Sequence, residues 1–174
     1  MNLSDEDIKK EIKNKRIVIS PKIFSDQISP GSIDLTLSDE FWVIKKKYQQ
    51  GKKIIDLKNE DFKKIFEKKK AKELVLLPYQ MCLGITKEKI KLPPDIMGRL
   101  EGRSRYARMG LAVHITSSLV QPGSENRQVL EIVNLAPFPL KIHHKMRISQ
   151  ICLSYTKTPT KRPYKKVGKI AKNQ

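Results

Sequence analysis

The stretch LPPDIMGRLEGRSRYARMGLAVHIT, residues 92–116, contains the pattern that decides the fold. Two short apolar runs, IMGRLE and LAVHIT, are separated by a polar segment with three arginines and a serine. Apolar or alternating runs of about four to eight residues, bounded by turn residues, are typical of β-strands. The stretch therefore predicts two strands joined by an arginine-rich turn.

The same pattern recurs along most of the chain on both sides of this stretch. Further runs of this kind are RIVIS, SIDLTL, EFWVIK, ELVLLP, MCLGIT, QVLEIV, LKIHH and ISQICLSY. Many short strands with proline and glycine between them favour a barrel or a jelly roll. We therefore expect a mainly β protein.

Two segments predict small helical additions to this β fold. Ser4 precedes three acidic residues, and Ile8 and Ile12 then fall on one helix face, which is the pattern of a capped helix start. A second helix is expected around DFKKIFEKKK, residues 61–70, within a mixed-charge segment. Both additions are short compared with the predicted strands.

Length and composition bound the class of protein. A chain of 174 residues is the size of one domain, and no apolar run approaches the roughly 20 residues of a membrane span. The N-terminus has no apolar signal core, and Cys82 and Cys152 lie inside apolar runs, as buried thiols do in a reducing compartment. We expect a cytoplasmic protein with no membrane partner.

The formal net charge of +18 raises the question of nucleic-acid binding, because clustered cations bind phosphate. Only eight of the 36 basic residues are arginine, and the lysines are spread over the N-terminus, residues 45–72 and the tail. The sequence contains none of the zinc-finger, helix-turn-helix or aromatic RNP patterns that read nucleic acid. We therefore do not expect nucleic acid as a partner.

The arginine-rich turn is a candidate anion site. Arg103, Arg105 and Arg108 surround Ser104, and a guanidinium fork beside a hydroxyl suits phosphate oxygens. A solvated turn with one or two surface ion pairs explains the same residues equally well. The residues alone leave both readings open.

Glu131 is a candidate general base, because it lies in the apolar run VLEIV. A carboxylate drawn into an apolar environment must be paired, hydrogen-bonded or protonated, and such environments also produce bases. Strand alternation also allows Glu131 to point outward while Leu130 and Ile132 face the core. The sequence does not choose between these two placements.

Taken together, these segments resemble the dCTP deaminase branch of the dUTPase-like superfamily. The matching motifs, in chain order, are LSDEDIKKEI, RIVISP, ISPGSIDLTLSDEFWV, LPPDIMGRLEGRSRYARMGL, VHIT, QPG, VLEIVN, PL with KMRISQICL, and RPY. The resemblance implies a dUTPase-like distorted jelly roll or β-barrel over residues 1–156, assembled as a homotrimer with nucleotide sites between subunits. Residues 157–174 would form a basic tail that closes as a lid over the triphosphate.

The resemblance also implies an activity and site residues. Glu131 would activate a water that attacks C4 of cytosine in dCTP, giving dUTP and ammonia, while Ser104 and Arg108 place the water and the base. The positions that match nucleotide-contacting residues are Arg103, Ser104, Arg105, Tyr106, Ala107, Arg108, Ser117, Gln121, Val129, Leu130, Glu131, Gln150, Tyr164, Lys169 and Gln174. The implied ligands are dCTP and dUTP, with dTTP as a candidate inhibitor.

We expect this deamination to need no metal. Zinc deaminases hold their metal with a His or Cys and a P-C-x-x-C pair, whereas Cys82 and Cys152 stand 70 positions apart without such a motif. Lowering the barrier would then fall to the base and to fixed donors. Mg²⁺ would enter only with the triphosphate, whose oxygens it bridges.

Two other functions stay open. One is a dUTPase, or a bifunctional enzyme that carries dCTP through to dUMP and pyrophosphate. We rank hydrolysis lower because Gln121 stands where the family has an aspartate that contacts the sugar 3′-hydroxyl. The other is a nucleotide-binding or nucleic-acid-binding protein that has kept the fold without catalysis.

Other polar or aromatic residues receive no catalytic role. His114 is expected to be a core or interface histidine, and His143 and His144 surface groups. Asp34 resembles a structural aspartate of the family and is expected to hydrogen-bond nearby backbone. Trp42 is expected in the core or at a trimer contact.

Overall fold

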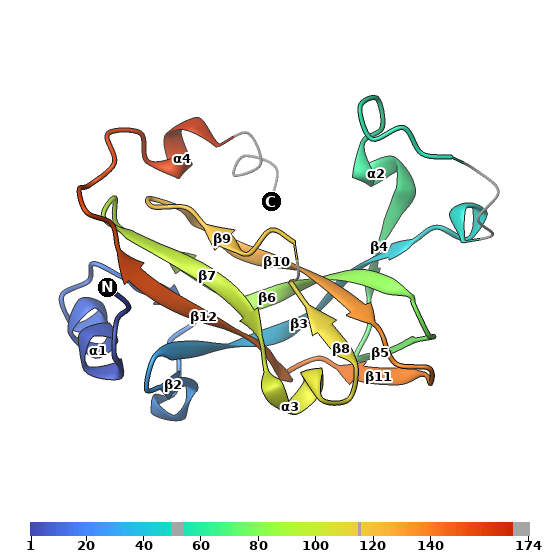
Figure 1. Ribbon diagram of the computed structural model, residues 1–174, viewed down its shortest axis with the longest axis horizontal. Coiled ribbons are helices and arrows are strands. Elements are labelled where there is room, and N and C mark those ends of the chain that lie inside the picture. Colours follow the sequence, from blue (N-terminus) through green and yellow to red (C-terminus); the bar gives the residue numbers. More distant parts are fainter. Residues whose placement is uncertain (50–53, 115, 169–174) are drawn as a thin grey trace.

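The computed structural model describes residues 1–49, 54–114 and 116–168, and most of its regular structure is antiparallel β-sheet (Figure 1). The strands are β1 (Val18–Ser20), β2 (Ile28–Ser29), β3 (Ser32–Ile44), β4 (Phe66–Lys70), β5 (Glu73–Leu76), β6 (Met81–Lys91), β7 (Ile96–Gly102), β8 (Leu111–Val113), β9 (Leu119–Val120), β10 (Glu125–Asn134), β11 (Leu140–His143) and β12 (Arg147–Tyr155). The helical segments are α1 (Asp5–Lys13), η1 (Ser25–Gln27), η2 (Lys46–Tyr48), α2 (Phe62–Ile65), α3 (Ser104–Ala107) and α4 (Tyr164–Val167). The prediction of a mainly β protein is confirmed.

The strands form one large sheet that curls around the core into a half-barrel (Figure 1). Its strand order is β8-β10-β6-β3-β12-β7-β9, with β1 beside β6 and with β2 and β4 beside β3. The strands β5 and β11 form a separate two-stranded sheet. Because sequence neighbours are often far apart in this order, distant segments are brought together at the sheet surface.

The N-terminal helix α1 begins as the sequence predicts. The Ser4 hydroxyl accepts a hydrogen bond from the Asp7 backbone N–H at 3.3 Å, and the Asp7 carboxylate accepts one from the Ser4 N–H at 3.0 Å. This reciprocal capping box satisfies two of the free donors at a helix start. Ile8 is fully buried and anchors the helix to the sheet.

The long strand β3 combines two runs that the sequence shows separately, SIDLTL and EFWVIK. Its pairing with β6 shifts register between Leu37 and Phe41, so a bulge accommodates the polar residues Ser38 and Asp39 within one strand. The side chains of Leu37 and Phe41 are both buried. The strand therefore continues because both of its halves pack into the same core.

The predicted helix over residues 61–70 is mostly wrong. Only α2, a single turn, is helical, and β4 follows it as a strand antiparallel to β3. Phe66 is buried at the start of β4, and the free edge of β3 supplies backbone partners. Tertiary pairing thus overrides the helical pattern, and the exposed lysines of β4 discourage further strand addition at this edge.

The core is formed mainly by the inward faces of β3, β6, β10 and β12. Fully buried side chains include Ile33, Leu35, Ile90, Ile132 and Ile151, each contributing roughly 1.5–3 kcal/mol by burial. On β10 the alternation puts Leu130 and Ile132 in this core and leaves the neighbouring odd-numbered residues on the other face.

The C-terminal segment folds back onto the turn that precedes β10. The backbone N–H of Tyr164 donates to the Pro122 carbonyl at 3.0 Å, and that of Lys165 donates to the Gly123 carbonyl at 3.1 Å. The Lys165 ammonium lies 2.6 Å from the Glu125 carboxylate. These contacts hold α4 against the sheet, while the division of the chain at residue 156 into domain and lid stays a prediction.

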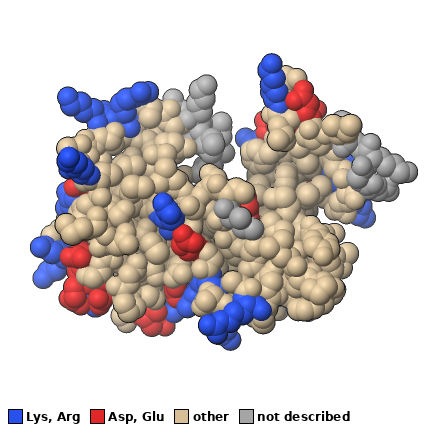
Figure 2. Space-filling view, viewed as in Figure 1, with Lys and Arg blue, Asp and Glu red and all other residues tan. Residues whose placement is uncertain are grey.

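The charge excess is dispersed on the face shown in Figure 2, where lysine and arginine side chains form several separate groups. Among the helices of the described residues, none is long and apolar enough to cross a membrane.

Candidate active site

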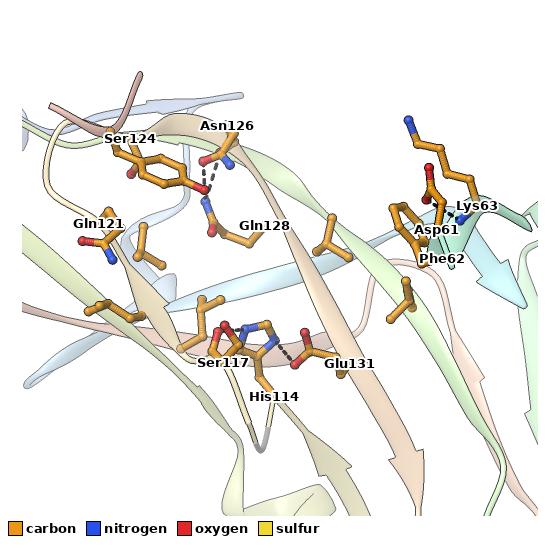
Figure 3. A pocket seen from close by; sticks show the side chains of 16 residues that line it. Asp61, Phe62, Lys63, His114, Ser117, Gln121, Ser124, Asn126, Gln128 and Glu131 are labelled. Atoms are coloured by element: carbon orange, nitrogen blue, oxygen red, sulfur yellow. Dashed lines mark hydrogen bonds and ion pairs between the residues drawn. The ribbon is translucent and has the colours of Figure 1, made fainter. Parts of the chain in front are cut away.

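A cavity of about 590 Å³ opens on the outer side of β10, where β6 and β9 border it (Figure 3). Cavities of this size are typical of small-molecule sites. The residues that line it are Asp61, Phe62, Lys63, Leu83, Leu100, His114, Ser117, Leu119, Val120, Gln121, Ser124, Asn126, Gln128, Val129, Glu131 and Tyr164. The cavity thus combines apolar walls with several polar groups.

Glu131 reaches this cavity because of its position in the alternation of β10. Leu130 and Ile132 are fully buried in the core, so the Glu131 side chain between them points to the opposite face. That face is hollowed here, and 31% of the Glu131 side chain is exposed. The outward placement considered from the sequence is therefore correct, and it puts the carboxylate in the cavity.

His114 is the nearest ionisable neighbour of Glu131. Its Nδ1 lies 3.3 Å from Glu131 Oε2, at ion-pair distance but not aligned as a hydrogen bond. Its backbone N–H donates to the Glu131 carbonyl at 2.8 Å, and its Nε2 lies 2.7 Å from the Ser117 carbonyl oxygen. The side chain is buried, as expected for a core histidine, but its contact with Glu131 was missed.

These contacts determine where the imidazole carries hydrogen. A carbonyl oxygen only accepts, so Nε2 must donate its hydrogen to Ser117. In a neutral ring Nδ1 would then present a lone pair to the Glu131 carboxylate, and two lone pairs repel. The contact is favourable when a proton lies on either His114 Nδ1 or Glu131 Oε2.

The cavity also brings together four other residues that the family resemblance predicts to contact the nucleotide. Ser117, Gln121, Val129 and Tyr164 line it together with Glu131, although they come from three separate segments of the chain. Leu130 does not line it, because its side chain is buried in the core.

Two polar wall residues, Asn126 and Gln128, were missed by the sequence reading. The Gln128 amide donates to the Asn126 side-chain oxygen at 3.1 Å (Figure 3). In a regular strand the side chains of Gln128 and Val129 would point to opposite faces of the sheet. The pairing of β10 with β6, however, shifts register between Arg127 and Val129. Because of this bulge both Gln128 and Val129 face the cavity, and no local signal in the sequence shows it.

The arginine-rich turn forms the short helix α3 and is fixed through Arg103. The Arg103 guanidinium lies 3.0 Å from the buried Asp34 carboxylate and donates to the Arg147 carbonyl at 3.3 Å. Burial raises the pKa of Asp34, and the nearby Arg103 opposes that rise. Asp34 thus pairs with a side chain, whereas the sequence suggested a backbone partner.

None of the remaining residues of this turn lines the Glu131 cavity. Ser104, Ala107 and Gln150 line a separate, more open depression, and His114 borders both hollows. Arg105 lies over the Tyr106 ring, 5.8 Å from its centre.

Arg108 is exposed at the end of α3, and its N–H donates to the Ser104 carbonyl at 3.1 Å. Lys169 and Gln174 lie outside the described residues. Within one chain, the described arginines of the turn therefore do not share a cavity with Glu131.

Comparisons with known proteins identify the relatives of this chain. The dCTP deaminase-like family matches residues 2–156. A Methanosphaera stadtmanae protein named dCTP deaminase, dUMP-forming, is 36% identical over 165 residues, covering 93% of this chain and 83% of its own. A Rhodospirillum rubrum protein named dCTP deaminase is 37% identical over 174 residues, covering 94% of this chain and 87% of its own.

A solved structure shows the same fold. The 2′-deoxycytidine 5′-triphosphate deaminase from Agrobacterium tumefaciens matches with a TM-score of 0.68 at 18% identity, covering 89% of this chain. The match covers 48% of that chain, so this protein spans about half its length.

An antiparallel half-barrel with a carboxylate in a ligand-sized cavity defines a class of β-sheet proteins with a candidate small-molecule site on the sheet surface. The sequence matches then specify the family within that class: this chain belongs to the dCTP deaminase family. The fold expected from the resemblance is confirmed.

Proposed function

We propose that this protein catalyses the hydrolytic deamination of dCTP. The observation that carries the proposal is Glu131, which lies in the cavity with His114 against its carboxylate. The relatives named dCTP deaminase support dCTP as the substrate.

The position of Glu131 in the cavity suits the proton transfers of this reaction. Glu131 takes a proton from water as the water oxygen attacks C4 of cytosine, and it delivers that proton to N3. The tetrahedral carbon then loses its amino group, and the hydroxyl proton passes through Glu131 to the leaving nitrogen. The overall reaction converts dCTP and water to dUTP and ammonia, and Glu131 returns to its starting protonation state.

The deamination as proposed uses no resident metal. Cys82 lies on β6 and Cys152 on β12, which are not neighbouring strands, so the two thiols are not placed as a zinc-binding pair. Mg²⁺ would enter as part of the substrate, bound to the triphosphate oxygens. The free cysteines also support our placement of the reaction in the reducing cytoplasm.

We further propose that the complete site forms between subunits of a homotrimer. A nucleoside triphosphate carries several negative charges, whereas the described lining of the Glu131 cavity has Lys63 as its single lysine or arginine. Arg103, Ser104 and Arg108 belong to a different surface of the same chain. A neighbouring subunit that places its α3 over this cavity would supply the missing charge and the donors that orient the water.

The reaction product separates the leading proposal from its alternative. We propose dUTP as the product, since hydrolysis needs a second water aligned on the α-phosphate, and Gln121 brings an amide, not a carboxylate, to the cavity. The alternative is a bifunctional enzyme that continues to dUMP and pyrophosphate, and several relatives carry the words dUMP-forming in their names.

Product analysis tests this proposal directly. The purified protein is incubated with dCTP and Mg²⁺, and in parallel with dUTP and with CTP, and the nucleotides, ammonia and pyrophosphate are measured. Ammonia with accumulating dUTP supports the monofunctional enzyme, whereas dUMP with pyrophosphate supports the bifunctional one. Nucleotide binding without turnover would contradict both and favour a non-catalytic binding protein. Addition of dTTP to the same assay tests it as an inhibitor.

A further inference from the structure

One wall of the Glu131 cavity comes from a segment that carries no role so far. Asp61, Phe62 and Lys63, at the start of α2, line the cavity on the side opposite Gln121 and Ser124 (Figure 3). In Figure 2 the surface is hollowed between the part built on α2 and the main sheet. The segment therefore borders the opening that a ligand must use.

This wall is held in place by packing and capping. The Phe62 ring meets the Trp42 ring edge-on, with 5.7 Å between centres and 69° between planes, and it also contacts Phe66. The Asp61 carboxylate accepts the Lys63 backbone N–H at 2.9 Å. Edge-to-face pairs of this kind contribute beyond simple burial. The turn is thus fixed relative to β3.

The wall formed by residues 61–63 carries two of the few charged side chains that line this cavity. Glu131 and Asp61 contribute carboxylates, and Lys63 contributes the one lysine or arginine side chain among the described lining residues. Its ammonium has no ion-pair or hydrogen-bond partner within residues 1–49, 54–114 and 116–168. The adjacent Lys64, by contrast, pairs with Glu60 at 3.7 Å and does not line the cavity.

We propose that Lys63 binds the phosphate groups of the nucleotide whose base is held at Glu131. The inference rests on the proposed function and extends it to a residue outside the arginine-rich turn and the tail. A lysine ammonium on a flexible four-carbon stem can follow a polyphosphate, and a charge-assisted contact with phosphate is stronger than a neutral one.

The opposite border of the cavity offers no second cation among the described residues. Tyr164 lines the cavity at the start of α4, but Lys165 pairs with Glu125 and neither Lys165 nor Lys166 lines the cavity. Lys63 is therefore the lysine or arginine of the described lining that a ligand with its base near Glu131 could use.

The test compares Lys63→Gln with Lys64→Gln, which removes the same charge one residue away. For Lys63→Gln we expect kcat/KM for dCTP to fall about tenfold, mainly through KM, and less at high salt because screening weakens the contact. Inorganic triphosphate, which lacks base and sugar, should inhibit the Lys63→Gln protein about tenfold more weakly. Lys64→Gln should change neither value by more than about twofold.

Equal values for wild type and Lys63→Gln, in an active wild type, would overturn the inference. So would equal losses in both variants, because general charge and not the cavity position would then be responsible. If the wild type releases no ammonia, the proposed function fails, and calorimetric titration of wild type and Lys63→Gln with inorganic triphosphate still tests the contact. Weaker binding by Lys63→Gln alone supports it.

Discussion

The Nδ1 atom of His114 lies 3.3 Å from Oε2 of Glu131, and the other ring nitrogen is fixed at 2.7 Å from the Ser117 carbonyl. The His114 side chain is 4% exposed, so solvent hardly competes for these contacts. We therefore expect His114 to act on the proposed reaction through Glu131, by holding the carboxylate in place.

Replacing His114 tests this positioning role. We choose His114→Asn because the backbone φ of His114 is 61°, in the left-handed region that asparagine tolerates better than most residues. The shorter amide cannot reach Glu131 as the imidazole does, so kcat should fall at least about tenfold while KM changes little.

The control for this variant is His144→Asn, since His144 is half-buried and contacts the Lys72 carbonyl away from the cavity. It should behave as wild type. A His114→Asn enzyme with unchanged kcat would show that the contact with Glu131 has no role in turnover.

Gly123 connects the tail to the sheet. Its φ is 74°, and a Cβ at this position would lie 2.5 Å from the Pro163 Cβ, so Gly123→Ala should displace α4 at a cost of about 1–2 kcal/mol or more. We expect faster tryptic cleavage after Lys165 and Lys166, followed by mass spectrometry, and weaker dCTP binding. Gly31→Ala is the matched control, because nothing lies within 4 Å of its added Cβ. Equal cleavage rates in both variants would contradict the docking of the tail.

Mixing two inactive variants tests the site between subunits. Arg108→Ala and Glu131→Gln should each be inactive alone, but subunit exchange would create some sites with an intact residue from each chain. Random exchange in a trimer restores about a quarter of the sites. Light scattering should report three chains for each variant. No recovery after confirmed exchange would place the whole site within one chain.

The two cysteines should differ in reactivity. Burial raises the pKa of the Cys82 thiol to about 12, so at pH 8 it stays protonated as well as inaccessible. A thiol reagent should therefore label no more than Cys152 in the native protein and both cysteines in denaturant. Rapid native labelling of Cys82 would show that β6 opens readily.

The sequence predicted where the strands lie and which side chains enter the core. It did not predict what the outward-facing side chains contact. The alternation of β10 correctly puts Leu130 and Ile132 in the core, because that pattern is local. Whether the face of Glu131 meets water or a cavity depends on β9 and α2, which approach from distant parts of the chain. No local pattern contains that information.

Long-range contacts also explain the other differences. Residues 66–70 form β4 instead of the predicted helix, because they pair with the edge of β3 and because the Phe66 side chain is buried in this arrangement. Burial of His114 was expected, but its contact with Glu131 depends on the left-handed backbone at His114. The predicted roles of the turn residues and of Gln150 on β12 stay predictions.

Ammonia release from dCTP by the wild type and by Glu131→Gln, measured side by side, tests the central claim most directly. Glutamine keeps the size of the side chain but cannot accept the proton of the water, so ammonia release should fall by at least about 100-fold while dCTP binding by titration is largely kept. A Glu131→Gln protein that retains most of the wild-type turnover would contradict the assignment of Glu131 as the base and with it the account of this site.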